Sequence, residues 1–194
     1  MTQIFDENGL VIPVTIIQAG PCMITEVKNV KKHGYSAVQI GFYEVKERKL
    51  KKPNLGHLKK NGCPPFKYLT ETRIADTSNL SLGQTISVDN LSVGQKVKIS
   101  GTSIGKGFTG NQKRHNFTRG PMSHGSKNHR QPGSIGAGTT PGRVIPGKKM
   151  AGQLGNKQIS IKNLQIVHID ATNNLLVLKG SVPGKAGNLL KICP

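Results

Sequence analysis

A long stretch without any acidic residue is the feature that most limits how this chain can fold. No aspartate or glutamate occurs between Asn90 and Ile169, and this window contains a basic, glycine-rich segment, Gly101–Gly155. Thirteen of the 24 glycines and four prolines lie in that segment, with only scattered aliphatic residues. Such a segment buries too little apolar surface to offset the entropy lost on ordering, and it cannot neutralise its own charge. We therefore expect a polyanion to order it, which indicates nucleic acid.

The overall composition supports this interpretation and argues against other classes. The net charge is +19, and residues 101–157 hold ten Lys or Arg and no acid. A membrane-surface segment would need an apolar helical face, which this segment lacks, and no apolar run is long enough to span a bilayer. The three cysteines are an odd, widely spaced set, which is typical of a reducing compartment rather than of a disulfide framework. Aromatic residues make up only 4%, so base stacking is not expected to be the main binding device.

The sequence on either side of the basic segment has β character. Apolar and alternating runs predict strands, and Ala-Thr-Asn-Asn after Asp170 predicts the turn of a hairpin. We expect Pro13 to place its strand at a sheet edge or at a bulge. The expected strands are Val11–Ile17, Ser36–Tyr43, Lys96–Ser100, Ile159–Asp170, Leu175–Lys179 and a short one at Leu189–Ile192.

These patterns predict a β domain that is split in sequence, 1–100 plus 157–194, with 101–156 as a long extended loop inserted between strands. A second basic block forms an insertion at about 44–76, where a short helix is expected around Asn54–Lys60. That block is either a solvated loop or an RNA-facing surface. The segments Asn79–Val88 and Asn90–Ile99 resemble each other and are interpreted as two turn-plus-strand units of one β domain.

Motifs for catalysis or cofactor binding are incomplete. Gly105–Gly110 fits G-x-G-x-x-G, but neither the following helix nor the required downstream acid is present, and the spacing for a P-loop also fails. The histidines of the basic segment have no cysteine or carboxylate near them in sequence to complete a metal site. No nucleophile–base pair or paired acids are recognisable. We therefore predict no enzyme activity, no cofactor and no metal.

The positive and imidazole side chains of the basic segment are the candidate RNA-binding residues. Arginine gives planar, bidentate contacts to phosphate, lysine supplies point charge, and histidine can hydrogen-bond to phosphates or bases. The alternatives are a solvated charged loop or a non-specific nucleic-acid chaperone. The predicted set is Lys106, Lys113, Arg114, His115, Arg119, His124, Lys127, His129, Arg130, Arg143, Lys148 and Lys149.

Several segments carry a resemblance to a known family. TQIFDENG, PVTIIQAGPC, QKRHNF, NLLVLKGSVPG and above all Ser123–Asn156 closely resemble the universal uL3 family of large-subunit ribosomal proteins, over nearly the whole chain. The combination of HGSKNHR with GAGTTPGRV is similar to the cyanobacterial and plastid branch. Lysine outnumbers arginine 22 to 6, which indicates an AT-rich genome and favours a plastid (chloroplast) stroma, with the cyanobacterial cytoplasm as the alternative.

The resemblance implies a non-enzymatic structural protein of the large ribosomal subunit. Such a protein binds 23S-type rRNA directly near its 3′ end, early in subunit assembly, and contacts neighbouring ribosomal proteins, with no membrane or small-molecule substrate. The implied fold is a translation-protein-type β-barrel whose long internal loop, here 101–156, extends towards the peptidyl transferase centre, with His124–Arg143 deepest. Two departures are visible. The chain begins about ten residues later than its relatives, which implies a misassigned start, a trimmed chain or a missing first barrel strand, and a missing strand would leave an exposed edge. Ala137–Thr139 lacks the glutamine that some relatives methylate.

Overall fold

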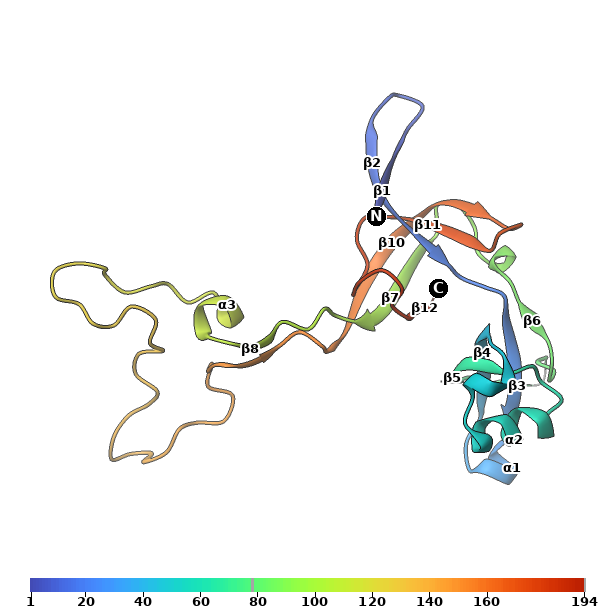
Figure 1. The fold of residues 1–194 in the computed structure, drawn as a ribbon, viewed down its shortest axis with the longest axis horizontal. Coiled ribbons are helices and arrows are strands. Elements are labelled where there is room, and N and C mark those ends of the chain that lie inside the picture. The colour runs from blue at the N-terminus through green and yellow to red at the C-terminus, as the bar shows by residue number, and fades with distance from the viewer. Residues whose placement is uncertain (78, 194) are drawn as a thin grey trace. The chain divides into compact units, whose positions relative to one another are not determined.

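The computed structural model describes residues 1–77 and 79–193, and the fold in them is mainly β (Figure 1). The helical elements are short. They are α1 (Val30–His33), η1 (Glu47–Lys49), α2 (Lys52–Lys60), η2 (Val88–Asn90) and α3 (Asn111–His115). The strands are β1 (Thr2–Phe5), β2 (Val11–Gln18), β3 (Cys22–Lys28), β4 (Ala37–Glu44), β5 (Phe66–Arg73), β6 (Thr85–Ile86), β7 (Lys96–Thr102), β8 (Gly107–Thr109), β9 (Gly152–Leu154), β10 (Gln158–Asp170), β11 (Leu175–Lys179) and β12 (Leu190–Cys193).

The strands form two open sheets and one small pair. The larger sheet has the order β1-β2-β11-β10-β7-β12, the smaller one has the order β5-β4-β3-β6, and β8 pairs with β9. Both orders are linear, so closure into a translation-protein-type barrel stays a prediction. The expected hairpin is confirmed, because β10 and β11 pair antiparallel around the turn at residues 171–174.

The chain divides into two compact units. Unit 1 comprises Met1–Lys98, Lys162–Ser181 and Cys193–Pro194, and unit 2 comprises Ile99–Ile161 and Val182–Ile192. The core of unit 1 consists of inward-facing aliphatic side chains at alternate strand positions, as strand periodicity requires. In β11, for example, Leu176 and Leu178 are fully buried, whereas the side chains between and beside them are not.

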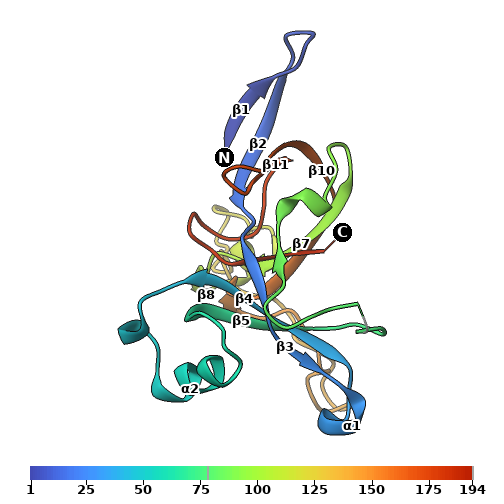
Figure 2. The same ribbon diagram turned by 90° about the vertical axis from the view of Figure 1, so that its right-hand side faces the viewer.

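A second apolar cluster lies between α2 and β5 in unit 1. Figure 2 shows α2 beside β5. Leu58 from α2 is fully buried and packs with Cys63 and with Phe66 of β5. Gly41 of β4 makes room for the Phe66 ring, because a Cβ at this position would collide with it. The predicted helix around Asn54–Lys60 is therefore confirmed as α2, and burial of Leu58 explains why so basic a segment forms a helix here.

The basic insertion at 44–76 contains more regular structure than its composition predicts. Its second half is β5, which pairs antiparallel with β4 along most of its length. Sequence reasoning missed β5, and it also missed β1 and β3. The reason is that polar and charged residues interrupt their alternation, as in the Lys, Thr, Glu and Arg residues of FKYLTETR.

Pro13 lies on an inner strand, but at a point where only the β1 side of that strand is paired, so the expected edge is a local one. β2 pairs with β1 on one side and with β11 on the other, and the ladder with β11 begins only at Val14. The Gly180 N–H donates to the Pro13 carbonyl at 2.8 Å, but proline has no N–H to return the bond. The Thr15 hydroxyl donates to the Gly180 carbonyl instead, at 2.6 Å, and so satisfies the acceptor that proline leaves unpaired.

The two similar segments at 79–88 and 90–99 form the same turn at two places in unit 1. In the first turn the Gly83 N–H donates to the Ile24 carbonyl and the Ile24 N–H donates to the Gln84 carbonyl, both at 2.9 Å. The side-chain oxygen of Gln84 closes the turn by accepting from the Ser81 N–H at 3.3 Å.

The second turn repeats these bonds on β10. Here the Gly94 N–H donates to the Ile166 carbonyl at 2.8 Å, the Ile166 N–H donates to the Gln95 carbonyl at 2.9 Å, and Gln95 accepts from the Ser92 N–H at 3.1 Å. In both cases a register shift follows the isoleucine, in β3 and in β10. The sequence repeat therefore corresponds to a repeated way of capping a bulged strand.

Candidate nucleic-acid interface

The central part of the basic segment has no regular secondary structure. Residues 116–151 contain neither helix nor strand, and Figure 1 shows them as an open trace that leaves α3 and returns to β9. We call residues 116–151 the basic arm. The strand pair β8–β9 lies at its base, with Gly107 opposite Leu154 and Thr109 opposite Gly152. Unit 2 thus brings the two ends of the basic arm together.

The segment before β8 and the segment after β9 also run side by side. The Ser103 N–H donates to the Lys157 carbonyl at 2.9 Å, and the Asn156 N–H donates to the Ser103 carbonyl at 3.2 Å. Gly155 adopts φ +72° and approaches the Ile104 carbonyl so closely that a Cβ would collide with it. Glycine is therefore needed here both for its backbone conformation and for space.

Two of the predicted RNA-binding residues hold the chain together at this base. The Arg114 guanidinium donates to the Met150 carbonyl at 2.6 Å, and the His115 Nε2–H donates to the same carbonyl at 3.1 Å. Gly152 leaves room for the Arg114 guanidinium, which a Cβ would meet at 2.6 Å. Both side chains are half-buried, so the structure gives them a role in positioning the basic arm.

A third predicted residue, His129, fastens the basic arm back onto α3. Its Nδ1–H donates to the Pro121 carbonyl at 3.1 Å, and its own carbonyl accepts from the Gln112 side chain at 3.1 Å. Gly120 passes close to the Asn128 carbonyl, where a Cβ would not fit. These contacts join segments 8 to 17 residues apart in a part of the chain that has no helix or strand beyond α3.

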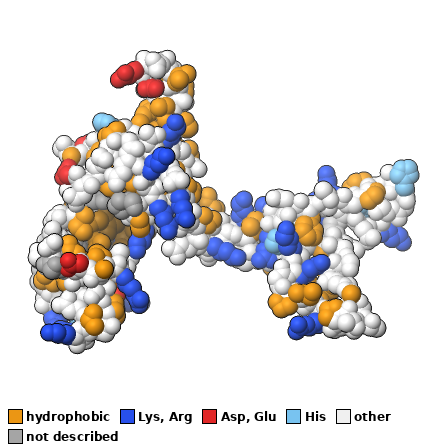
Figure 3. Space-filling view, turned by 180° about the vertical axis from the view of Figure 1, so that it is seen from behind, with side chains coloured by type: hydrophobic (Ala, Val, Ile, Leu, Met, Phe, Trp, Pro, Cys, Tyr) orange, Lys and Arg blue, Asp and Glu red, His pale blue; other side chains and the backbone are white. Residues whose placement is uncertain are grey.

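The other nine predicted residues are solvent-exposed. In the described part of the chain, none of the twelve forms an ion pair with an acidic side chain. Figure 3 shows blue Lys and Arg side chains spread over the surface of unit 2 on the face drawn, with no red acidic side chain among them. The exposed nine are Lys106, Lys113, Arg119, His124, Lys127, Arg130, Arg143, Lys148 and Lys149.

Three of these exposed cations converge on a cavity. Lys106, Lys113 and Arg130 line it together with Phe108 and Asn111, and its volume is about 380 Å³. Sequence reasoning missed Phe108 and Asn111. The low aromatic content of the chain favours charge over stacking as the binding device, and nothing in the sequence indicates that Arg130 returns to α3.

Charged groups in unit 1 form a separate network. Lys28 donates to Glu71, the Tyr35 hydroxyl donates to Glu71 at 2.9 Å, and Arg73 lies over the Tyr35 ring at 5.4 Å. The hydrogen bond from Lys28 lowers the pKa of Glu71, and the same bond raises the pKa of Lys28. These groups pair with one another between β3 and β5, so their role is to stabilise unit 1.

Metal-binding and membrane-spanning features are missing from residues 1–77 and 79–193. No three or more His, Cys, Asp or Glu side chains in these residues gather in a way suited to hold a metal ion. No helix among them is long and apolar enough to cross a membrane. Burial raises the pKa of the Cys22 and Cys63 thiols, which keeps both protonated and unreactive at neutral pH.

The fold and the site together define a basic, mainly β protein with a polycationic, glycine-rich segment that lacks regular secondary structure. The family model described as Ribosomal protein L3 matches residues 37–194, and the chain belongs to this family. It is 61% identical to the large ribosomal subunit protein uL3 of Synechococcus elongatus over 194 residues, covering 100% of this chain and 91% of that protein.

Plastid-type relatives are equally similar. The large ribosomal subunit protein uL3c of Pyropia yezoensis is 64% identical over 192 residues, which cover 99% of this chain and 94% of that protein. The uL3c protein of Phaeodactylum tricornutum is 62% identical over 194 residues, covering 100% of this chain and 94% of that protein. The resemblance noted in the sequence, including its cyanobacterial and plastid character, is confirmed.

Proposed function

We propose that this protein is a structural constituent of the large ribosomal subunit and binds 23S-type rRNA directly. The observation that carries the proposal is the set of nine exposed cationic and imidazole side chains without acidic partners in the described residues, on and beside an arm that has no regular secondary structure. Family membership and the names of the relatives support the same function. We propose a non-enzymatic role in a plastid stroma or, as the alternative, in a cyanobacterial cytoplasm.

The finer features of the proposal come from the family resemblance. We place the binding site near the 3′ end of the rRNA and its formation early in subunit assembly, with the arm extending towards the peptidyl transferase centre. The division into a β domain, 1–100 plus 157–194, and a loop, 101–156, comes from the sequence pattern, and the resemblance adds that the β domain is a barrel. The free rRNA-facing groups would be the exposed nine, whereas Arg114, His115 and His129 would mainly shape the arm.

The mechanism is charge neutralisation by a thin peptide. Packed rRNA helices repel one another through their phosphates, and each Lys or Arg placed between them offsets that repulsion and releases counterions. Glycine keeps the arm thin, because a backbone without side chains occupies little space between helices. Recognition of this kind reads the shape and backbone of RNA more than its sequence.

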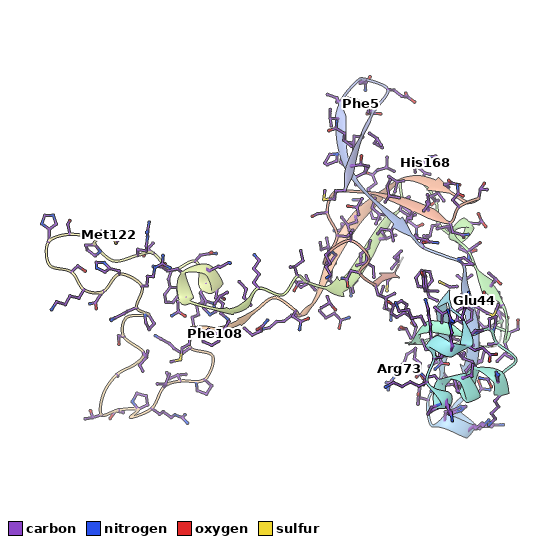
Figure 4. All side chains as sticks on the ribbon, viewed as in Figure 1. Phe5, Glu44, Arg73, Phe108, Met122 and His168 are labelled. Carbon is purple, nitrogen blue, oxygen red and sulfur yellow. The ribbon has the colours of Figure 1, made fainter. Side chains whose placement is uncertain are left out.

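The β1–β2 hairpin of unit 1 is acidic and apolar, unlike the basic arm, and this favours a protein partner over RNA. No Lys or Arg precedes Lys28, and Asp6 and Glu7 form the hairpin tip, where Figure 3 shows acidic side chains. Phe5, labelled in Figure 4, is 67% exposed on this hairpin. Acidic and apolar surface is unfavourable beside phosphate, so we propose that the hairpin contacts a neighbouring, basic large-subunit protein.

The salt dependence of rRNA binding tests the proposed function. We expect the full-length protein to bind a transcript of the 3′ region of 23S-type rRNA with an affinity that falls steeply with salt. Replacing Arg119, Arg130 and Arg143 by Ala should flatten the slope by up to about one unit for each phosphate that is no longer contacted. An unchanged slope in the triple variant would count against direct phosphate contacts.

A matched control removes the same charge from unit 1. Lys31, Lys32 and Lys179 are exposed and lie outside the basic arm. Their triple replacement by Ala changes the net charge equally, and we expect a smaller change of slope. Equal effects of the two triple variants would show that net charge, and not the arm, governs binding.

A further inference from the structure

The cavity beside α3 has the features of a binding site for one nucleotide. It lies within unit 2, at the base of the basic arm, and its volume of about 380 Å³ is within the range of roughly 300–1,000 Å³ typical of ligand pockets. One wall is formed by residues between Lys106 and Lys113, which include β8 and the first residues of α3. Arg130 comes from the opposite side of the arm.

Specific hydrogen bonds between distant segments position the residues that line this cavity. The Gln112 side chain donates to the His129 carbonyl at 3.1 Å and so holds the residue next to Arg130 against α3. Thr109 is buried, and its hydroxyl donates to the Gly152 carbonyl at 3.4 Å, which fixes β8 to β9. Arg130 therefore faces this wall because of specific contacts between distant segments.

Each kind of group that lines the cavity matches a part of a nucleotide. Lys106, Lys113 and Arg130 supply three positive charges, which suit a phosphate. Phe108 is 78% exposed, and an exposed ring beside cations suits a stacked base. Figure 4 labels Phe108 at β8, close to α3.

Asn111 provides the most specific indication. The residue is only 6% exposed, it lines the cavity, and its Oδ1 has no hydrogen-bond partner among the described residues. An unpaired buried acceptor costs free energy until a donor reaches it. The amino and imino groups on the edges of unpaired bases are such donors, whereas phosphate oxygens are not.

We propose that this cavity receives a single unpaired nucleotide of the rRNA, whose base stacks on Phe108 and, once the Asn111 side chain turns towards the cavity, donates a hydrogen bond to Asn111 Oδ1. The phosphate of that nucleotide lies among Lys106, Lys113 and Arg130. The inference rests on the proposed function and adds one base-specific contact to an interface that otherwise reads the RNA backbone. A base within a duplex is stacked on both faces and cannot reach Phe108, so the nucleotide comes from a loop or bulge.

The test combines full-length variants with the transcript of the 3′ region of 23S-type rRNA. Loss of a stacked base by substitution of its aromatic partner corresponds to a loss of affinity of at least about fivefold. We expect this loss for Phe108→Ala at an unchanged salt slope, because no charge is removed. Phe108→Tyr retains a stacking ring and should bind like the unaltered protein. Phe5→Ala, at another exposed phenylalanine, is the matched control and should also have no effect.

A second measurement locates the base directly. Ultraviolet irradiation of intact large subunits, followed by mass spectrometry of the peptides, should yield a nucleotide adduct at Phe108. A Phe108→Ala variant that binds as well as Phe5→Ala, or adducts elsewhere in the chain but none at Phe108, would overturn the nucleotide pocket while salt-dependent binding upholds the proposed function. If the unaltered protein itself fails to bind the transcript, the proposed function is overturned and the pocket with it.

Discussion

Gly155 shows how a single residue controls the base of the basic arm. Its φ of +72° is unfavourable for other residues, and a Cβ would collide with the Ile104 carbonyl. We expect Gly155→Ala to disrupt the bonds between Ser103, Asn156 and Lys157 at a local cost of about 1–3 kcal/mol. Hydrogen exchange of the Ser103 and Asn156 amides in the full-length protein should become faster.

The control for this change is a glycine with the same backbone conformation but open space around it. Gly147 has φ +83°, and a Cβ added there would have no heavy atom within 4 Å. Gly147→Ala should therefore leave the exchange of Ser103 and Asn156 unchanged. Equal exchange rates in the two variants would mean that the close approach at Gly155 has no structural importance.

Glu71 gives the stability of unit 1 a dependence on pH. The hydrogen bond from Lys28 lowers the pKa of Glu71, so its contribution to stability is present above its unfolded pKa and is lost as pH falls through the folded pKa. The Glu71 side chain is 35% exposed, so we expect Glu71→Gln to cost less than about 1 kcal/mol at neutral pH. Urea unfolding at neutral and acidic pH should show this difference shrinking towards zero in acid.

The matched control is Glu47→Gln. Glu47 also pairs with a lysine, Lys59, at 3.0 Å, but both side chains are 57% exposed. Water screens such a pair strongly, so its removal should change the free energy of unfolding very little at any pH. A pH-dependent change at Glu47 as large as that at Glu71 would contradict the role assigned to the Lys28–Tyr35–Glu71 network.

At the scale of elements, replacement of glycine by alanine should have opposite effects on stability in the repeated turn and in α2. Gly94 has φ +88°, and its N–H bonds to Ile166, so Gly94→Ala should destabilise the protein by about 1 kcal/mol. Gly83→Ala should behave alike, because its turn makes the same bonds to Ile24. Gly56 lies within α2 with open space around it, so Gly56→Ala should stabilise by roughly 0.5–1 kcal/mol. Thermal unfolding of the three variants gives the signs, and a stabilising Gly94→Ala would be the contrary result.

At this scale the sequence predicted the elements that follow simple periodicity. The alternation of β11 and the turn before it identified the β10–β11 hairpin, and the leucines near Asn54–Lys60 identified α2. The strand β5 was missed because its charged residues face solvent or pair across the sheet, as Glu71 does with Lys28. Periodicity cannot show such pairing, because the partner lies far away in sequence.

At the scale of the whole molecule, we expect the basic arm to be protected from proteolysis only when RNA is bound. Few contacts hold residues 116–151 to the rest of unit 2, chiefly the bonds to Met150 and His129. We expect limited trypsin treatment of the free protein to cut first within 101–156, and bound rRNA transcript to suppress these cuts. A free protein that resists cleavage there, while unit 1 is cut, would show that the arm is stabilised by its own contacts.

The sequence by itself determined the chemical character of the arm and predicted the class of partner. Charge and glycine content are properties of composition, and a segment with ten cations and no acid has the same need for a polyanion in any fold. Only the tertiary structure decided which of these side chains make contacts within the protein and which are exposed. It placed Arg114 and His115 on the Met150 carbonyl, and it brought Arg130 to the cavity beside Phe108 and Asn111. These roles depend on contacts between residues far apart in the chain, and such contacts follow from folding rather than from local pattern.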